Sequence, residues 1–76
     1  MPLTNLLKHL AQAKKHVAMA ERNLAQQRSI VADFERDGQD STEAKKLLAR
    51  FEEVHRLHVA SMERIRRELA ASIAAT

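Results

Sequence analysis

The sequence predicts an all-α protein in which two long antiparallel helices form a helical hairpin, with residues 1–76 as one domain. Three observations support this fold class. Apolar residues recur at helical spacing in both halves of the chain, neither half alternates with period two, and Gly38, the only glycine, lies almost at the middle. We expect a first helix over residues 3–37, a turn over 38–40 and a second helix over 41–73.

The first half of the chain has a seven-residue repeat of apolar residues. Five of them recur at strict intervals of seven, and a second series follows each by three places. This pattern over about five repeats is typical of the a and d positions of a coiled-coil seam. The a series is Leu3, Leu10, Val17, Leu24 and Val31, and the d series is Leu6, Ala13, Ala20, Gln27 and Phe34.

Gln27 is the one strongly polar residue in this predicted seam. At a core position, it can donate a hydrogen bond across the bundle and fix the register of the helices. Alternatively, it lies partly exposed near the edge of the helix. The sequence leaves both interpretations open.

The second half also carries an apolar stripe, with a spacing nearer 3.6 than 3.5 residues per turn. A stripe of that period drifts slightly around the helix. We expect it to pack against the first helix and to contribute to the core of a dimer. Its members are Ala44, Leu47, Leu48, Phe51, Val54, His58, Met62, Ile65, Leu69 and Ile73.

The turn is predicted from its capping residues. Gly38 can adopt the left-handed conformation that ends a helix. Asp40 then serves as the N-cap of the second helix, and Glu43, three residues later, completes a capping box. Ser41 is the alternative N-cap. A loop this short makes the two helices antiparallel neighbours.

A hairpin centred near Gln39 sets the expected register between the helices. It brings Ala20 near His58 and Gln27 near Phe51, so that large residues repeatedly face small ones. The other expected pairs are Leu24 with Val54, Val31 with Leu47, Phe34 with Ala44, and Ala13 with Ile65.

A lone hairpin of 76 residues would leave much of its apolar set in water and would be marginally stable. We therefore expect a homodimer that closes a four-helix bundle. Residues 1–32 have a net charge of +4, residues 64–76 of +2, and residues 33–63 of −3. With the turns at opposite ends, each acidic turn meets basic termini, so the dimer is predicted to be antiparallel.

Four histidines are the candidates for metal chemistry. His55 and His58 lie three residues apart, a spacing that can ligate one metal ion, and His9 and His16 lie seven apart. Glu52 and His55 form a Glu-x-x-His motif, yet the partner motif that a di-metal site needs on another helix is missing. We predict no metal and no other cofactor, with His55 and His58 as polar residues in or beside the seam.

Basic residues at outward positions are the candidates for nucleic-acid contact. They could follow phosphates, but no aromatic residues for base stacking are interleaved with them, and the net charge is only +3. We favour the simpler interpretation, a solvated helix surface. The candidates are Lys8, Lys14, Lys15, Arg22, Arg64, Arg66 and Arg67.

Other function classes lack their sequence patterns. No nucleophile arrangement, glycine-rich phosphate loop or Cys/His motif is present, so no enzyme is expected. The chain has no cysteine, no apolar run near the ~20 residues of a membrane span, and no signal-peptide pattern in MPLTNLLKHL. We therefore expect a cytoplasmic protein that does not associate with a membrane.

The stretch ERDGQDSTEAKKLLARFEEVHRLH, with Arg28 before it and Leu69 after it, carries a family resemblance. From residue 25 onward, over about 45 residues, the chain resembles a group of small, uncharacterised bacterial helical proteins, mostly α-proteobacterial. The resemblance implies a helical hairpin in a bacterial, cytoplasmic protein, and it implies no activity. The expected architecture is also similar, at fold level only, to the plasmid protein Rop, an antiparallel dimer of helical hairpins that binds paired RNA loops.

The sequence thus favours a non-enzymatic structural or protein-interaction module, a homodimeric helical hairpin that presents a charged surface to a protein partner. The alternative is a Rop-like RNA- or DNA-binding regulatory protein that uses its basic helix face.

Overall fold

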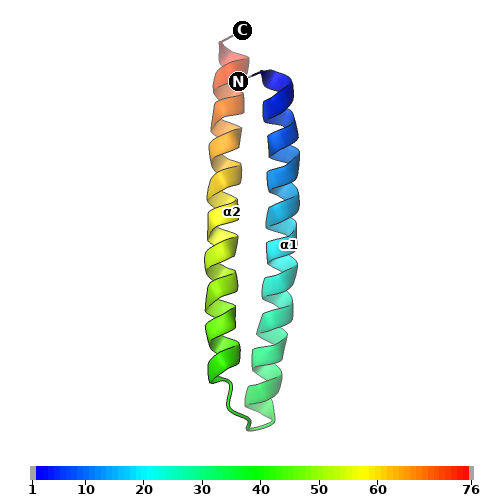
Figure 1. The fold of residues 1–76 in the computed structure, drawn as a ribbon, viewed down its shortest axis with the longest axis vertical. Helices are drawn as coiled ribbons and strands as arrows, with labels where there is room; N and C mark the ends of the chain where they lie inside the picture. The colour runs from blue at the N-terminus through cyan, green and yellow to red at the C-terminus, as the bar shows by residue number, and fades with distance from the viewer. Residues whose placement is uncertain (1, 76) are drawn as a thin grey trace.

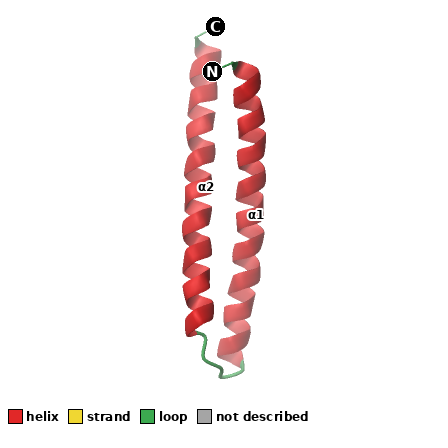
Figure 2. Ribbon diagram, in the orientation of Figure 1, coloured by secondary structure: helices red, strands yellow, loops and turns green. Residues whose placement is uncertain are grey.

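The computed structural model describes residues 2–75 and consists of two helices, α1 (Leu3–Arg36) and α2 (Thr42–Ala74), joined by residues 37–41. The helices run side by side in opposite directions, with both termini at the same end (Figure 1). No strand occurs within the described residues, and the chain forms a rod with extents of 59 × 14 × 13 Å (Figure 2). The all-α hairpin is confirmed, and each helix boundary lies within one residue of its expected place.

α1 ends where the sequence predicts, before Gly38, which has a φ of 70° in the left-handed region. The Gly38 N–H donates to the Glu35 carbonyl at 3.2 Å, and the Gln39 N–H donates to the Phe34 carbonyl at 2.8 Å. These two bonds form a Schellman motif, which satisfies carbonyls that the helix end would leave unpaired. A Cβ at Gly38 would meet nothing within 4 Å, so the backbone angle alone favours glycine here.

The start of α2 differs from the expected capping box. Ser41 occupies the N-cap position without a side-chain cap, so Asp40 is not the N-cap. The Asp40 carboxylate instead accepts hydrogen bonds from the Thr42 N–H at 3.0 Å and the Thr42 hydroxyl at 2.6 Å. Because the helix begins one residue later than the box requires, Glu43 is only the second helical residue and does not reach back. It pairs with Lys46 at 3.3 Å.

The seam between the helices follows the predicted repeat of α1 through most of its length. Leu6 is the most enclosed residue, at 2% exposed, and Leu10 and Phe34 are half-buried. Leu3, which was also expected in the packed set, is 45% exposed in the single hairpin. The buried residues of α1 are Leu6, Ala13, Val17, Ala20, Leu24, Gln27 and Val31.

α2 packs through a seven-residue repeat rather than the drifting stripe of the prediction. Its seam residues alternate at spacings of four and three, which is the repeat of a helix that coils with a partner. Leu47 and Val54 were expected in the seam but are 40% and 43% exposed, because Leu48 and His55 take the inward positions beside them. The seam residues of α2 are Ala44, Leu48, Phe51, His55, His58, Met62, Ile65, Leu69 and Ser72.

The register differs from the expected one by about a helical turn. The ring of His58 lies beside that of His16, with centroids 5.2 Å apart, whereas its expected neighbour Ala20 is four residues later in α1. The Gln27 Nε2 donates to the Ala44 carbonyl at 3.0 Å rather than lying beside Phe51. The five-residue loop explains the shift, since α1 extends past the start of α2 before the chain turns back (Figure 1).

The hairpin leaves many large apolar side chains in water. In α2 only Ala44 is buried among the described residues. Neither helix, within residues 2–75, holds a stretch that is long and apolar enough to cross a membrane. The large apolar residues that are exposed are Leu3, Leu7, Met19, Ile30, Leu47, Val54, Leu57 and Ile73.

Candidate functional site

Two faces flank the seam, one on each side of the hairpin, and they differ in composition. His16 directly precedes the seam residue Val17, whereas Glu21 directly follows the seam residue Ala20. Side chains at these two positions leave the seam on opposite sides. We call the side of His16 the histidine face and the side of Glu21 the charged face.

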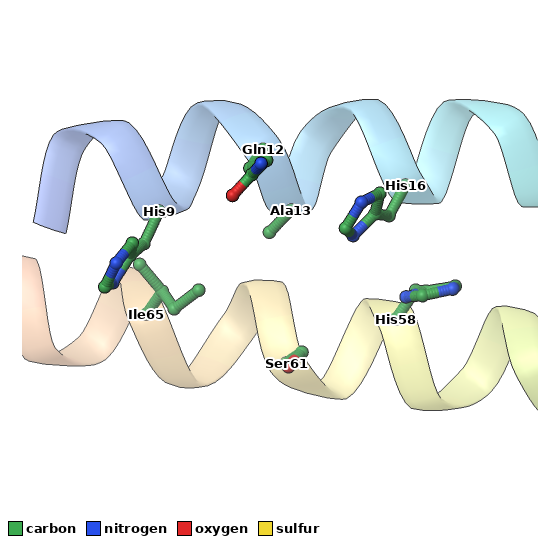
Figure 3. A pocket seen from close by; sticks show the side chains of 7 residues that line it. All are labelled: His9, Gln12, Ala13, His16, His58, Ser61 and Ile65. Atoms are coloured by element: carbon green, nitrogen blue, oxygen red, sulfur yellow. The ribbon is translucent and has the colours of Figure 1, made fainter.

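An open pocket of about 200 Å³ lies on the histidine face, in the half of the hairpin near the termini. Figure 3 shows side chains from both helices facing one another across it. Within it the imidazoles of His16 and His58 meet, tilted by 47°. The lining residues are His9, Gln12, Ala13, His16, His58, Ser61 and Ile65. Such a lining suits a small polar ligand or an ion better than a large apolar molecule.

The histidine face continues toward the turn as an apolar surface. Ile30 lies two repeats after His16, and Leu47 and Val54 lie two repeats and one repeat before Ser61. All three therefore share the side that the pocket occupies. Met19 lies three residues after His16, and Leu57 lies three residues after Val54, so both are on the same side of the hairpin. We call this set the apolar surface, and all its members are exposed: Met19, Ile30, Leu47, Val54 and Leu57.

Sequence reasoning found this surface only in part. It grouped Leu47 and Val54 with the seam, and it missed Met19 and Ile30. The seven-residue series through His16 consists of His9, His16, Asn23 and Ile30, so Ile30 is its one large apolar member. A single apolar residue does not form a repeat, and the sequence therefore carries no clear signal for this surface.

The charged face carries residues of both signs. The Lys45 Nζ lies 3.7 Å from the Glu35 carboxylate, and the His55 Nε2 lies 3.8 Å from that of Glu21, so both contacts join the two helices. The Lys45 and Glu35 side chains are both more than half exposed, and such pairs contribute little stability. This face is therefore a solvated surface, and its exposed apolar residues lie near the termini.

Three basic candidates for nucleic-acid contact form a straight column. Lys8, Lys15 and Arg22 are seven residues apart along the outer edge of α1, on the side opposite the seam, and all are exposed. No ion-pair partner for them occurs among residues 2–75. Arg67 lies on the opposite outer edge, that of α2, so the structure does not bring it to this column.

The other three basic candidates lie on different surfaces. Arg64 donates to the Ser61 hydroxyl at 3.2 Å, and Arg66 lies 3.4 Å from the Glu63 carboxylate. Lys14 directly follows the seam residue Ala13, as Glu21 follows Ala20, so it lies on the charged face. The seven basic residues therefore do not converge into one groove.

The histidines are arranged differently from the pair that their spacing allowed. His58 faces the pocket and lies beside the ring of His16, whereas His55 lies beside Glu21 on the charged face. Both His55 and His58 are half-buried, as expected for polar residues in or beside the seam. In the part of the chain that the structure describes, no three His, Asp or Glu side chains gather into a group that could hold a metal ion.

The turn end of the hairpin is acidic, and the Asp40 carboxyl there has a lowered pKa. The hydroxyl of Thr42, and after it the Thr42 N–H, lower the pKa of the Asp40 carboxyl below its ordinary value of 3.8, with a smaller effect from Lys45. Both hydrogen bonds favour the charged form of the carboxyl. Asp40 therefore stays negative at neutral pH and satisfies an N–H at the start of α2.

Comparison with protein-family models, with curated proteins and with solved structures finds no match for this chain. The resemblance to small bacterial helical proteins and the likeness to Rop therefore stay predictions.

Proposed function

We propose that the chain is a non-enzymatic structural or protein-interaction module of the cytoplasm that acts as a homodimer of hairpins. The observation that carries the proposal is the apolar surface, because five large apolar side chains are exposed on one face of one hairpin. Soluble monomers rarely expose a continuous apolar patch without a partner for it. A second copy of the chain is the occupant, and the two apolar surfaces then form the core of a four-helix bundle.

Charge supports an antiparallel arrangement of the two hairpins. Residues 33–63, around the turn, have a net charge of −3, whereas residues 1–32 and 64–76 are net positive. Since both termini lie at the end opposite the turn, each hairpin has an acidic end and a basic end (Figure 1). Two hairpins with their turns at opposite ends place unlike charges together, while a parallel pair would place like charges together.

The size of the apolar surface sets the expected affinity. Full burial of a large apolar side chain contributes about 1.5–3 kcal/mol. These side chains are already about half buried in the single hairpin, so burial of the rest contributes about 1 kcal/mol each. Ten such side chains in two chains give about 10 kcal/mol, which is comparable with the ~4–15 kcal/mol cost of association. We therefore expect a weak dimer whose population rises with protein concentration.

Leucine substitutions on opposite faces test the dimer. Leu57→Glu places a charge on the apolar surface, and Leu7→Glu, on the charged face, is its matched control because Leu7 is similarly exposed. By sedimentation equilibrium, the wild type and Leu7→Glu should dimerise as concentration rises, and Leu57→Glu should stay monomeric. A wild type that remains monomeric at high concentration contradicts the proposal, as does equal dimerisation of both variants.

A single label in the turn tests the orientation. A cysteine at Gln39 is unique because the chain has no other, so a spin label there reports one distance per dimer. In the antiparallel dimer the two labels lie near opposite ends of a rod whose long extent is 59 Å. Short label-to-label distances would show the turns at the same end and refute the antiparallel arrangement.

Nucleic-acid binding is the second candidate, and the column of Lys8, Lys15 and Arg22 is the observation that favours it. Its cations recur about every 10 Å along α1, and binding to phosphates would weaken steeply with added salt. The test is binding to duplex RNA or DNA at low salt, with all three residues changed to Ala as the variant. Failure to bind at low salt removes this candidate.

A further inference from the structure

The histidine pocket has chemistry that a contact surface between hairpins does not use. We propose that His16 and His58 together bind one divalent transition-metal ion, with zinc as the best fit, and that water completes its coordination. The pair comes from two different helices, α1 and α2, so the site exists only in the folded hairpin.

The separation of the two rings fits a shared metal ion. Their centroids are 5.2 Å apart, and the ring planes are tilted by 47°. Two imidazoles that bind one tetrahedral zinc ion at Zn–N distances of about 2.0–2.1 Å have centroids about 5 Å apart. The helices therefore hold the rings at a separation that suits a shared ion before any ion arrives.

The surroundings of the pair leave room for the rest of a coordination sphere. The pocket is open and has a volume of about 200 Å³, enough for several water molecules. Gln12 and Ser61 line it beside the imidazoles, and Figure 3 shows them on opposite helices. Their polar groups can accept or donate hydrogen bonds to metal-bound water, as outer partners do in zinc sites. Arg64 lies just outside the lining, where its guanidinium donates to the Ser61 hydroxyl at 3.2 Å and adds a positive charge beside the pocket.

The donor set selects the kind of ion. Neutral imidazole nitrogens suit zinc, copper and nickel, whereas magnesium and calcium prefer oxygen ligands. His9 does not join the pair, because seven residues separate it from His16, about 10 Å along the helix. His55 lies beside Glu21 on the charged face. With two protein ligands, the ion is held more weakly and exchanges faster than in a closed site with four ligands.

A metal ion at this site would link the helices. An ion that binds the folded chain alone stabilises it in proportion to its concentration relative to Kd. We expect zinc to raise the Tm of the hairpin by several degrees and magnesium to leave it unchanged. Because both ligands lie in one chain, the site predicts one zinc ion per hairpin.

Isothermal titration of zinc chloride into the full chain tests the site. The variants His16→Ala and His58→Ala should each weaken zinc binding by about tenfold or more, while His55→Ala should bind as the wild type does. Circular dichroism without metal checks that each variant keeps its helices, and His16→Ala is the decisive variant because His16 is exposed and its loss costs little packing. Zinc binding that survives in His16→Ala shows an adventitious ion only and overturns the proposal.

The variant Leu57→Glu separates this inference from the dimer. It should still bind one zinc ion per chain even though it does not dimerise, because both histidines belong to the same chain. Loss of zinc binding in a folded Leu57→Glu hairpin, or a stoichiometry of one zinc per two chains, would overturn a site within one chain. A monomeric wild type that binds zinc one to one would leave the metal site standing and refute only the dimer.

Discussion

Gln27 offers the sharpest test of how the two helices are joined. Its side chain is buried at 5% exposed, and its Nε2 donates to the Ala44 carbonyl of α2 at 3.0 Å. This settles the choice that the sequence left open, since Gln27 is a core residue that bonds across the seam. The Ala44 carbonyl lies inside α2, so it also accepts the helix's own hydrogen bond and is not left unpaired when Gln27 changes.

The expected costs follow from these contacts. Gln27→Ala removes a hydrogen bond worth about 0.5–1.5 kcal/mol and one buried methylene worth about 0.8 kcal/mol, so we expect a loss of about 2 kcal/mol in the free energy of unfolding. Gln27→Met removes the same bond but keeps the length and burial of the side chain. Since no orphaned acceptor remains, we expect Gln27→Met to lie within about 1 kcal/mol of the wild type.

Urea denaturation followed by circular dichroism measures both variants. The exposed neighbour Gln26→Ala is the matched control and should change stability little. Each curve is recorded at several protein concentrations, so that a shift in association is not read as a shift in folding. If Gln27→Ala is as stable as Gln26→Ala, or if Gln27→Met loses as much as Gln27→Ala, then the buried bond is not what Gln27 contributes.

Three further changes test other parts of the fold. Leu6→Ala, at the most enclosed residue, should cost about 2–5 kcal/mol in urea denaturation, while Leu7→Ala, its exposed neighbour, should cost little; equal losses would refute the assigned seam. Gly38→Ala should cost about 1 kcal/mol and Gly38→Asn less, because φ is 70° and nothing crowds the new Cβ; a stable Gly38→Ala would mean that the turn does not need the left-handed angle. Asp40 has a lowered pKa, so its contribution to stability is full above pH ~4 and is lost as the pH falls through the lowered value. Asp40→Asn should therefore flatten the acid side of the stability profile, and an unchanged profile would contradict the hydrogen bonds from Thr42.

The sequence was sufficient for the fold because two strong local signals agree. The repeat from Leu6 to Val31 predicts one long helix and the face that it buries, and Gly38 predicts where that helix ends. The register between the helices could not be predicted from the sequence. One more or one fewer residue in the loop moves α2 along α1 without disturbing the apolar repeat of either helix. The choice between Ser41 and Asp40 at the start of α2 changes that loop by one residue, and local propensity barely separates the two.

The candidate site shows the same limit. The four histidines are visible in the sequence, and His55 with His58 is the pair that spacing suggests. The pair that meets in space is His16 with His58, which lie on different helices. Which residues meet across the seam depends on the register and on the side from which each side chain leaves it. Spacing along one helix therefore cannot identify a site that two helices share.

The five-residue loop also bears on domain swapping, in which two copies of the chain would exchange a helix. The same contacts between α1 and α2 form when the loop straightens and each α1 packs against the α2 of another molecule, which is a domain-swapped pair built from continuous helices. Residues 37–41 make the difference between the two assemblies, through the left-handed angle of Gly38 and the bonds of Asp40 to Thr42. We therefore expect the left-handed angle of Gly38 to favour closure of the seam within one molecule over closure between two.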